Sequence, residues 1–264
     1  MTLHPALWAL GVIALFIFEV GVNIVAEISD KNEGVFVTQE DTWIPTGPFL
    51  INRTGIGLER MLRYAALVFA IAGIIGIYLA AVTGFIVILS IGIAGFLLTI
   101  IYAVPPFMLG FRGIGEPVPF IAFGPLPGIA LYFLMTGNVS LTAAAVTLPA
   151  AFWITAVRYA HHLPDRSTKS GARFEGMHRK RVEHASAALA TFACLGALSV
   201  FILLPIAGAL VLLPLTVTIA LTYPALRNSM RANGNAVGIS GGTRYYALLH
   251  LAGSISMAVA MLFA

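Results

Sequence analysis

Long stretches without any Asp, Glu, Lys or Arg dominate the chain. They cover residues 1–18, 64–111, 117–157, 185–226 and 245–264. A helix that crosses the hydrocarbon core of a bilayer needs about 20 apolar residues, so each of the three middle stretches is long enough for two crossings. Only 10% of the 264 residues are charged, against about 25% in soluble domains. The pattern predicts an all-α, polytopic membrane bundle of about eight transmembrane helices, in a single domain over residues 1–264.

The positive charges predict how this bundle is oriented. The expected helices span residues 6–27, 63–82, 84–103, 118–136, 140–159, 185–203, 205–222 and 245–263. Uncharged turns are expected at Thr83-Gly84, at Gly137-Asn138 and over residues 205–208. All 15 Lys and Arg residues fall in the remaining connections between the expected helices, and one of these connections is residues 158–181. Because positive residues mark the cytoplasmic side, we expect a multi-pass protein of the cytoplasmic membrane with these loops in the cytoplasm and both termini outside. The net charge of +4 therefore reflects topology, and nucleic acid is not an expected partner.

The first expected helix carries a polar stripe. Glu19, Asn23, Glu27 and Asp30 are spaced four, four and three residues apart, so they share one face of a helix. Ionisable residues inside a membrane span are costly and usually mark a functional cavity. Two alternatives stay open: Asp30 with its charged neighbours is a solvated helix end, or Glu19 is an ion site of a small transporter.

A second polar stretch follows the fifth expected helix. His161 and Asp165 lie four residues apart and share a face if the helix continues, although Pro164 favours a helix end there. Both polar helix ends open on the same side of the membrane. Carboxylates facing each other beside basic loops suit a Mg²⁺ ion that also binds phosphate oxygens. The pair His161-His162 beside Asp165 leaves zinc as an alternative.

Three motifs resemble those of the UbiA superfamily of intramembrane aromatic prenyltransferases, most closely its 1,4-dihydroxy-2-naphthoate (menaquinone-type) branch. Residues 102–117, YAVPPFMLGFRGIGEP, followed by Phe123-Gly124-Pro125, are similar to the family's Tyr-x-x-Pro-Pro-x-x-Leu…Arg-Gly-x-Gly-Glu loop and the next helix start. Residues 26–34 resemble the first acidic motif, Asn-Asp-x-x-Asp, with Ala26 in place of Asn. Residues 161–169 resemble the second acidic motif, with His and Lys in place of its first Asn and last Asp.

The resemblance implies an enzyme that transfers a prenyl group from a prenyl diphosphate to an aromatic quinone precursor. It implies Mg²⁺ held by Glu27, Asp30 and Asp165, and catalytic roles for Tyr102, Asp30 and Asp165. The implied contacts to the diphosphate come from Arg53, Arg112, Asn23, His161 and Lys169. A prenyl-diphosphate cyclase and a non-catalytic homologue stay open as alternatives.

The resemblance also bears on the number of helices. Family members have nine helices, and their acidic motifs end the second and the sixth. Here the motifs end the first and the fifth expected helices, so the chain is expected to lack the family's first helix.

Overall fold

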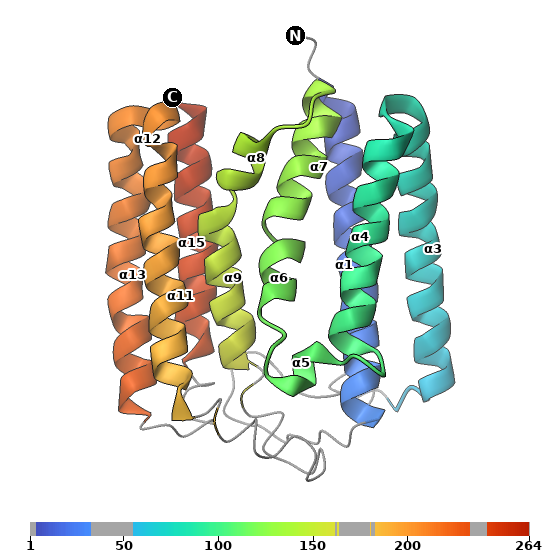
Figure 1. The fold of residues 1–264 in the computed structure, drawn as a ribbon, viewed down its shortest axis with the longest axis horizontal. Helices are drawn as coiled ribbons and strands as arrows, with labels where there is room; N and C mark the ends of the chain where they lie inside the picture. The colour runs from blue at the N-terminus through green and yellow to red at the C-terminus, as the bar shows by residue number, and fades with distance from the viewer. Residues whose placement is uncertain are drawn as a thin grey trace.

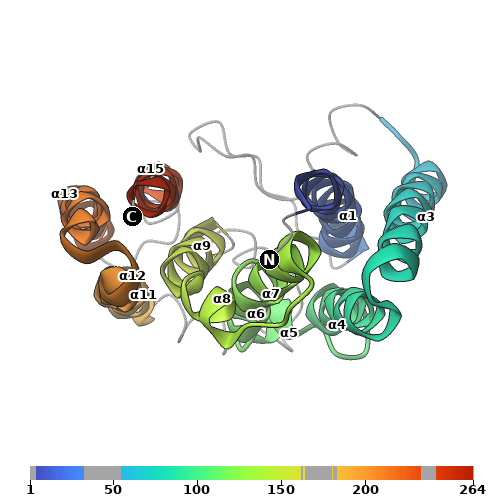
Figure 2. The same ribbon diagram turned by 90° about the horizontal axis from the view of Figure 1, so that it is seen from above.

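The computed structural model describes residues 4–32, 55–161, 163, 180, 183–232 and 242–263. Over these residues the chain is helical, with short 3-10 turns and no strand. The long helices run side by side (Figure 1) and form a crescent when seen from above (Figure 2). The expected all-α membrane bundle is confirmed for the described part of the chain.

The helices follow one another as the uncharged stretches predict. The first half consists of α1 (Pro5–Asn32), α3 (Leu58–Thr83), α4 (Phe85–Ala103) and the short α5 (Leu109–Arg112). Two crossings are each built from two helices, α6 (Pro117–Ala122) with α7 (Pro125–Thr136), and α8 (Leu141–Ala145) with α9 (Leu148–His161). The rest comprises α11 (Ala185–Ser199), η1 (Val200–Leu203), α12 (Leu204–Ala207), η2 (Gly208–Val211), α13 (Leu212–Arg231) and α15 (Thr243–Leu262).

The number of crossings agrees with the prediction. Seven stretches are long and apolar enough to span a membrane, and one of them, Ala185–Arg231, has 47 residues. A straight helix of that length would measure about 70 Å, more than twice the thickness of the hydrocarbon core. Instead, α11 and α13 lie side by side after the chain reverses through η1, α12 and η2 (Figure 1). The described chain therefore makes eight crossings.

All three expected turns are found. Gly84 separates α3 from α4, and a Cβ on it would lie 2.6 Å from Cζ of Phe133, so a larger residue would have to displace this ring. Gly137 ends α7 with φ 73°, a left-handed conformation that favours glycine. Gly208, with φ 52°, lies in the reversal between α11 and α13.

Three of the expected helices have wrong limits. The second was expected to start at residue 63, but α3 begins at Leu58. The expected end of the first helix at residue 27 is wrong, because α1 continues to Asn32. The Ser29 hydroxyl donates a 2.7 Å hydrogen bond to the Ala103 carbonyl at the end of α4, and this tertiary contact holds the polar last turns of α1. The seventh helix was expected over residues 205–222 but is α13, Leu212–Arg231, since helical turns occupy the reversal and Pro224 lies inside the helix without ending it.

The half of the bundle that contains α9, α11, α13 and α15 is tightly packed. Its core includes Trp153, Leu189, Tyr246 and Leu249, all fully buried. Cβ atoms on Gly196 and Gly253 would lie 2.1 and 2.4 Å from the Trp153 indole, so these glycines let α11 and α15 approach α9. This half fixes the position of α9.

One end of the bundle collects the charged residues. The C-terminal ends of α1, α9 and α13 lie there, together with the N-terminal ends of α3, α11 and α15 (Figure 1, lower edge). We call it the charged end; among the residues on these helix ends are Lys31, Arg60, Arg231 and Arg244. The described positive residues thus gather on one side, as their alternation along the sequence predicts.

Candidate functional site

A cavity of about 700 Å³ lies among α1, α3, α4, α6 and α7. Its walls are apolar over most of their area and include Phe18, Phe69, Phe96 and Leu126. Glycines on α3 and α4 line it as well; a Cβ on Gly73, Gly76 or Gly92 would meet no atom within 4 Å. The only charged side chains among the lining residues of this cavity in the described chain are Glu19 and Arg158.

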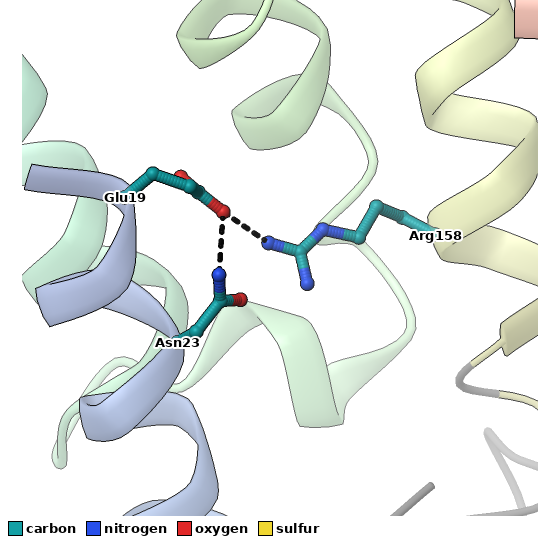
Figure 3. Close-up of polar contacts among 3 residues, drawn as sticks. All are labelled: Glu19, Asn23 and Arg158. Carbon is teal, nitrogen blue, oxygen red and sulfur yellow. Dashed lines mark hydrogen bonds and ion pairs between the residues drawn. The ribbon is translucent and has the colours of Figure 1, made fainter. Parts of the chain in front are cut away.

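These two side chains form an ion pair across the cavity. Nη2 of Arg158 on α9 lies 3.4 Å from Oε1 of Glu19 on α1, and Asn23 donates a 3.0 Å hydrogen bond to the same oxygen (Figure 3). The Glu19 and Arg158 side chains are 31% and 18% exposed. The pair joins residues 139 positions apart in the chain. It links the two helices that carry the motif-like sequences at their C-terminal ends.

Aromatic side chains surround the arginine. The Arg158 guanidinium lies 5.3 Å from the centre of the Phe123 ring, in a cation–π contact. Phe123 is placed by the junction of α6 and α7, where a Cβ on Gly124 would lie 2.4 Å from Ala151 of α9. Tyr102 lines the cavity, and with Arg158 it also lines a small hollow beside Gly110 and Gly115. Arg158 therefore lies between an apolar cavity and an aromatic wall.

The last turns of α1 carry two more carboxylates. Glu27 and Asp30 lie three residues apart at the charged end, and Asp30 is buried. Glu27 follows Glu19 by eight residues, which is about 12 Å along a helix axis. Glu19, Asn23, Glu27 and Asp30 all belong to one continuous helix, so the predicted polar stripe is placed on α1 from the cavity to the charged end.

The loop after α4 is tightly folded at the charged end. Met108 and Gly113 have φ of 46° and 77°, and Gly110 packs against the ring of Tyr102. Arg112 donates a 2.6 Å hydrogen bond from Nη2 to the Pro106 carbonyl. Arg112 is not among the cavity-lining residues, so the structure brings Tyr102 to the cavity wall but holds Arg112 in its own loop.

The other predicted residues divide into two groups. His161 is the last residue of α9 and lies at the charged end. Arg53, Asp165 and Lys169 lie outside the described residues. In the part of the chain that the structure describes, no three His, Cys, Asp or Glu side chains gather as a metal-binding group.

The sequence interpretation missed Arg158. It counted this residue with the cations of a cytoplasmic connection, although the expected helix over residues 140–159 contains it. In the structure Arg158 lies within α9 and lines the cavity. One signal could have found it: a carboxylate inside a membrane span needs a partner, and Arg158 is the first cation met inward from the polar end of α9.

Comparisons with protein-family models and with curated proteins found no match. The fold and the cavity define a polytopic α-helical membrane protein with an apolar cavity among its helices and a charge pair in the cavity wall.

Proposed function

We propose that this protein is an integral-membrane prenyltransferase, which transfers a prenyl group from a prenyl diphosphate to an aromatic quinone precursor. The observation that supports it best is the cavity: about 700 Å³ of apolar space within the membrane-spanning helices, with polar side chains toward the end where α1 presents Glu27 and Asp30. A ligand with a long apolar tail and an anionic head matches a cavity that is apolar along most of its length and polar toward one end.

The tail and the head contribute differently to binding. Lipid tails are as apolar as the cavity wall, so moving a prenyl chain from the bilayer into the cavity changes its solvation little. Contacts to the anionic head therefore dominate the affinity. The candidates for these contacts are Arg53, Arg112, Asn23, His161 and Lys169.

Magnesium fits the donors at the charged end. Mg²⁺ prefers oxygen ligands and is usually held by one or two carboxylates together with substrate phosphates, not by a cage of protein groups. Glu27 and Asp30 provide two carboxylates three residues apart on α1. We propose that they hold Mg²⁺ with Asp165. The bound ion would neutralise charge on the departing diphosphate.

The reaction breaks the bond between the first prenyl carbon and the diphosphate oxygen. A carbon–carbon bond forms to the aromatic ring, and the ring loses a proton. The cations at the charged end stabilise the negative charge that develops on the leaving group, while the apolar cavity keeps water away from the prenyl cation. Tyr102 lies on the cavity wall, where an aromatic side chain can face that cation.

We place the charged end in the cytoplasm and the protein in the cytoplasmic membrane, with a role in menaquinone biosynthesis. The gathering of Lys and Arg residues on one end of the bundle supports this orientation. A water-soluble diphosphate product would then leave into the cytoplasm.

The test is a transfer assay with the purified full chain in lipid nanodiscs. It uses Mg²⁺, a labelled prenyl diphosphate and a panel of aromatic acceptors that includes 1,4-dihydroxy-2-naphthoate. We expect diphosphate release coupled to a prenylated aromatic product. We also expect Asp30→Asn to lose most of this activity, whereas Glu59→Gln, which alters an exposed carboxylate on α3, retains it.

Two other outcomes would contradict the proposal. Release of diphosphate with a cyclic hydrocarbon and no acceptor product would make the protein a prenyl-diphosphate cyclase. No release from any substrate, with prenyl-diphosphate binding unchanged in Asp30→Asn, would make it a non-catalytic homologue.

A further inference from the structure

Two groups of polar side chains lie at different depths along α1, and the deeper one includes the two charged residues of the cavity wall. The outer group, Glu27 and Asp30, lies at the charged end, and the inner group consists of Glu19, Asn23 and Arg158. Glu19 precedes Glu27 by eight residues on α1, about 12 Å along the helix axis. A diphosphate held at the outer group leaves Arg158 of the inner group available to a different polar ligand group.

We infer that Arg158 binds the acidic group, a carboxylate or phenolate, of the aromatic acceptor, and that Glu19 pairs with Arg158 while the acceptor is absent. The inference rests on the proposed function, because it takes the second ligand of the cavity to be that acceptor. Beyond the proposed function, it states which residue recognises the acceptor and which chemical group of the acceptor that residue binds.

The contact geometry of Arg158 leaves room for a ligand. A guanidinium has five N–H donors and prefers to bind a carboxylate through two parallel hydrogen bonds. Here a single nitrogen, Nη2, approaches one oxygen of Glu19 at 3.4 Å. Within the described part of the chain, Glu19 is the one hydrogen-bond acceptor found for this guanidinium, and it is reached by one terminal nitrogen (Figure 3).

Helix packing alone does not explain the pair. Burying two charges costs several kcal/mol per ion, and only excellent geometry with further hydrogen bonds recovers this cost. The Glu19–Arg158 contact is long and involves one guanidinium nitrogen, and both side chains line the cavity. Ionisable side chains within membrane spans typically serve ligands or ions.

The surroundings of Arg158 favour a flat aromatic ligand. Phe123 presents its ring to the guanidinium at 5.3 Å, Tyr102 lies on the adjoining hollow, and the rest of the cavity is apolar. The ring of the acceptor must also lie beside the prenyl carbon that it attacks, and this carbon is bonded to the diphosphate. An aromatic body with one acidic group, directed at Arg158, meets both conditions.

Glu19 then acts as an internal competitor for Arg158. Removing its charge frees the guanidinium, and an external anion no longer has to displace a carboxylate. The inference therefore predicts opposite effects on anion binding for substitutions of the two partners. A purely structural ion pair predicts weaker binding, or none, for both, because either substitution would disturb α1 and α9.

The experiment measures the binding of 1-hydroxy-2-naphthoate, a fluorescent aromatic carboxylate, to the full chain in nanodiscs without prenyl diphosphate. We expect Arg158→Gln to weaken binding by about tenfold or more, with Arg158→Lys between it and the unchanged protein. We expect Glu19→Gln to tighten binding by about threefold or more. The double variant Glu19→Gln/Arg158→Gln, which leaves no unpaired buried charge, should bind as weakly as Arg158→Gln.

The controls separate charge recognition from general apolar binding. Glu59→Gln alters an exposed pair with Arg63 on α3 and should leave the affinity unchanged. The methyl ester of the probe, which lacks the negative charge, should bind weakly and equally to all variants. Palmitate should compete poorly, whereas equal competition by palmitate would make this a lipid-carboxylate site and overturn the aromatic assignment.

The inference would be overturned if the double variant bound the probe as tightly as the unsubstituted protein does. It would also be overturned if Glu19→Gln bound the probe more weakly than that protein. Because this assay contains no prenyl diphosphate, its outcome is independent of catalysis. Failure of the transfer assay with Arg158-dependent binding of the probe would remove the proposed reaction but leave the anion site. Successful transfer, together with probe binding that does not depend on Arg158, would support the proposed reaction and overturn the anion site.

Discussion

Trp153 is held between two glycines, Gly253 and Gly196, and this arrangement predicts that a methyl group added at Gly253 destabilises the protein. A Cβ on Gly253 of α15 would lie 2.4 Å from Cζ3 of the indole, and one on Gly196 of α11 would lie 2.1 Å from Nε1. These atoms are on opposite edges of the ring system. Trp153 is fully buried, so moving it away from one glycine drives it toward the other helix.

We expect Gly253→Ala to destabilise the protein by about 1–3 kcal/mol, the usual cost of adding a methyl group to a packed core. Ordinary van der Waals contact begins near 3.4 Å, so the indole or α15 must shift by about 1 Å. The matched control is Gly76→Ala on α3, where a Cβ would meet no atom within 4 Å. This control should be neutral or stabilising by up to about 1 kcal/mol, since alanine favours a helix over glycine.

The assay is reversible unfolding in mixed micelles with increasing SDS, followed by far-ultraviolet circular dichroism. The reasoning is refuted if Gly253→Ala unfolds at the same SDS fraction as the unchanged protein. It is also refuted if Gly76→Ala lowers stability as much as Gly253→Ala, because the cost would then come from any methyl group in a span and not from the contact with Trp153.

Three further predictions concern other parts of the molecule. Tyr246→Phe removes the buried 2.7 Å hydrogen bond to Ser229 and should cost about 1 kcal/mol in the same unfolding assay, whereas Tyr223→Phe at an exposed position should cost nothing measurable. Gly137→Ala should cost about 1 kcal/mol because φ is 73° there, and Gly137→Asn should cost less because asparagine tolerates the left-handed region. Under the proposed function, a chelator should abolish prenyl transfer and added Mg²⁺ should restore it; transfer that persists in excess chelator would contradict a Mg²⁺ requirement.

The sequence predicts the crossings well because the bilayer constrains them. A span needs about 20 apolar residues and backbone hydrogen bonds within itself, so the uncharged stretches and the glycines at positions 84 and 137 give their number and turns. Helix ends are less predictable. The polar last turns of α1 stay helical because Ser29 binds the Ala103 carbonyl, a contact between residues 74 positions apart that no local pattern contains.

The candidate site is predicted only in part for the same reason. The stripe of Glu19, Asn23, Glu27 and Asp30 follows from helical periodicity, and the structure keeps it on one helix. The partner of Glu19 does not follow from periodicity, since Arg158 is 139 residues away and belongs to a helix defined by its own packing. Charge counting places Arg158 with the loop cations, because composition does not distinguish a cation in the last turns of a helix from one just beyond it. The roles of Arg53, Asp165 and Lys169 stay predictions, since they lie outside the described residues.

Helix α9 connects the packed half of the bundle to the cavity. Trp153 and Arg158 are five residues apart on it, about 140° around the helix, so one points into the core with α11 and α15 while the other reaches the cavity and Glu19. The packed side holds α9 without charged groups, through Trp153, Ala156 and Ala160, all fully buried. Because this packing already positions the helix, the Glu19–Arg158 pair is not needed to hold α9 in place. Its long, single contact is therefore compatible with a guanidinium that exchanges Glu19 for a ligand, since the exchange would leave the helix where its core residues hold it.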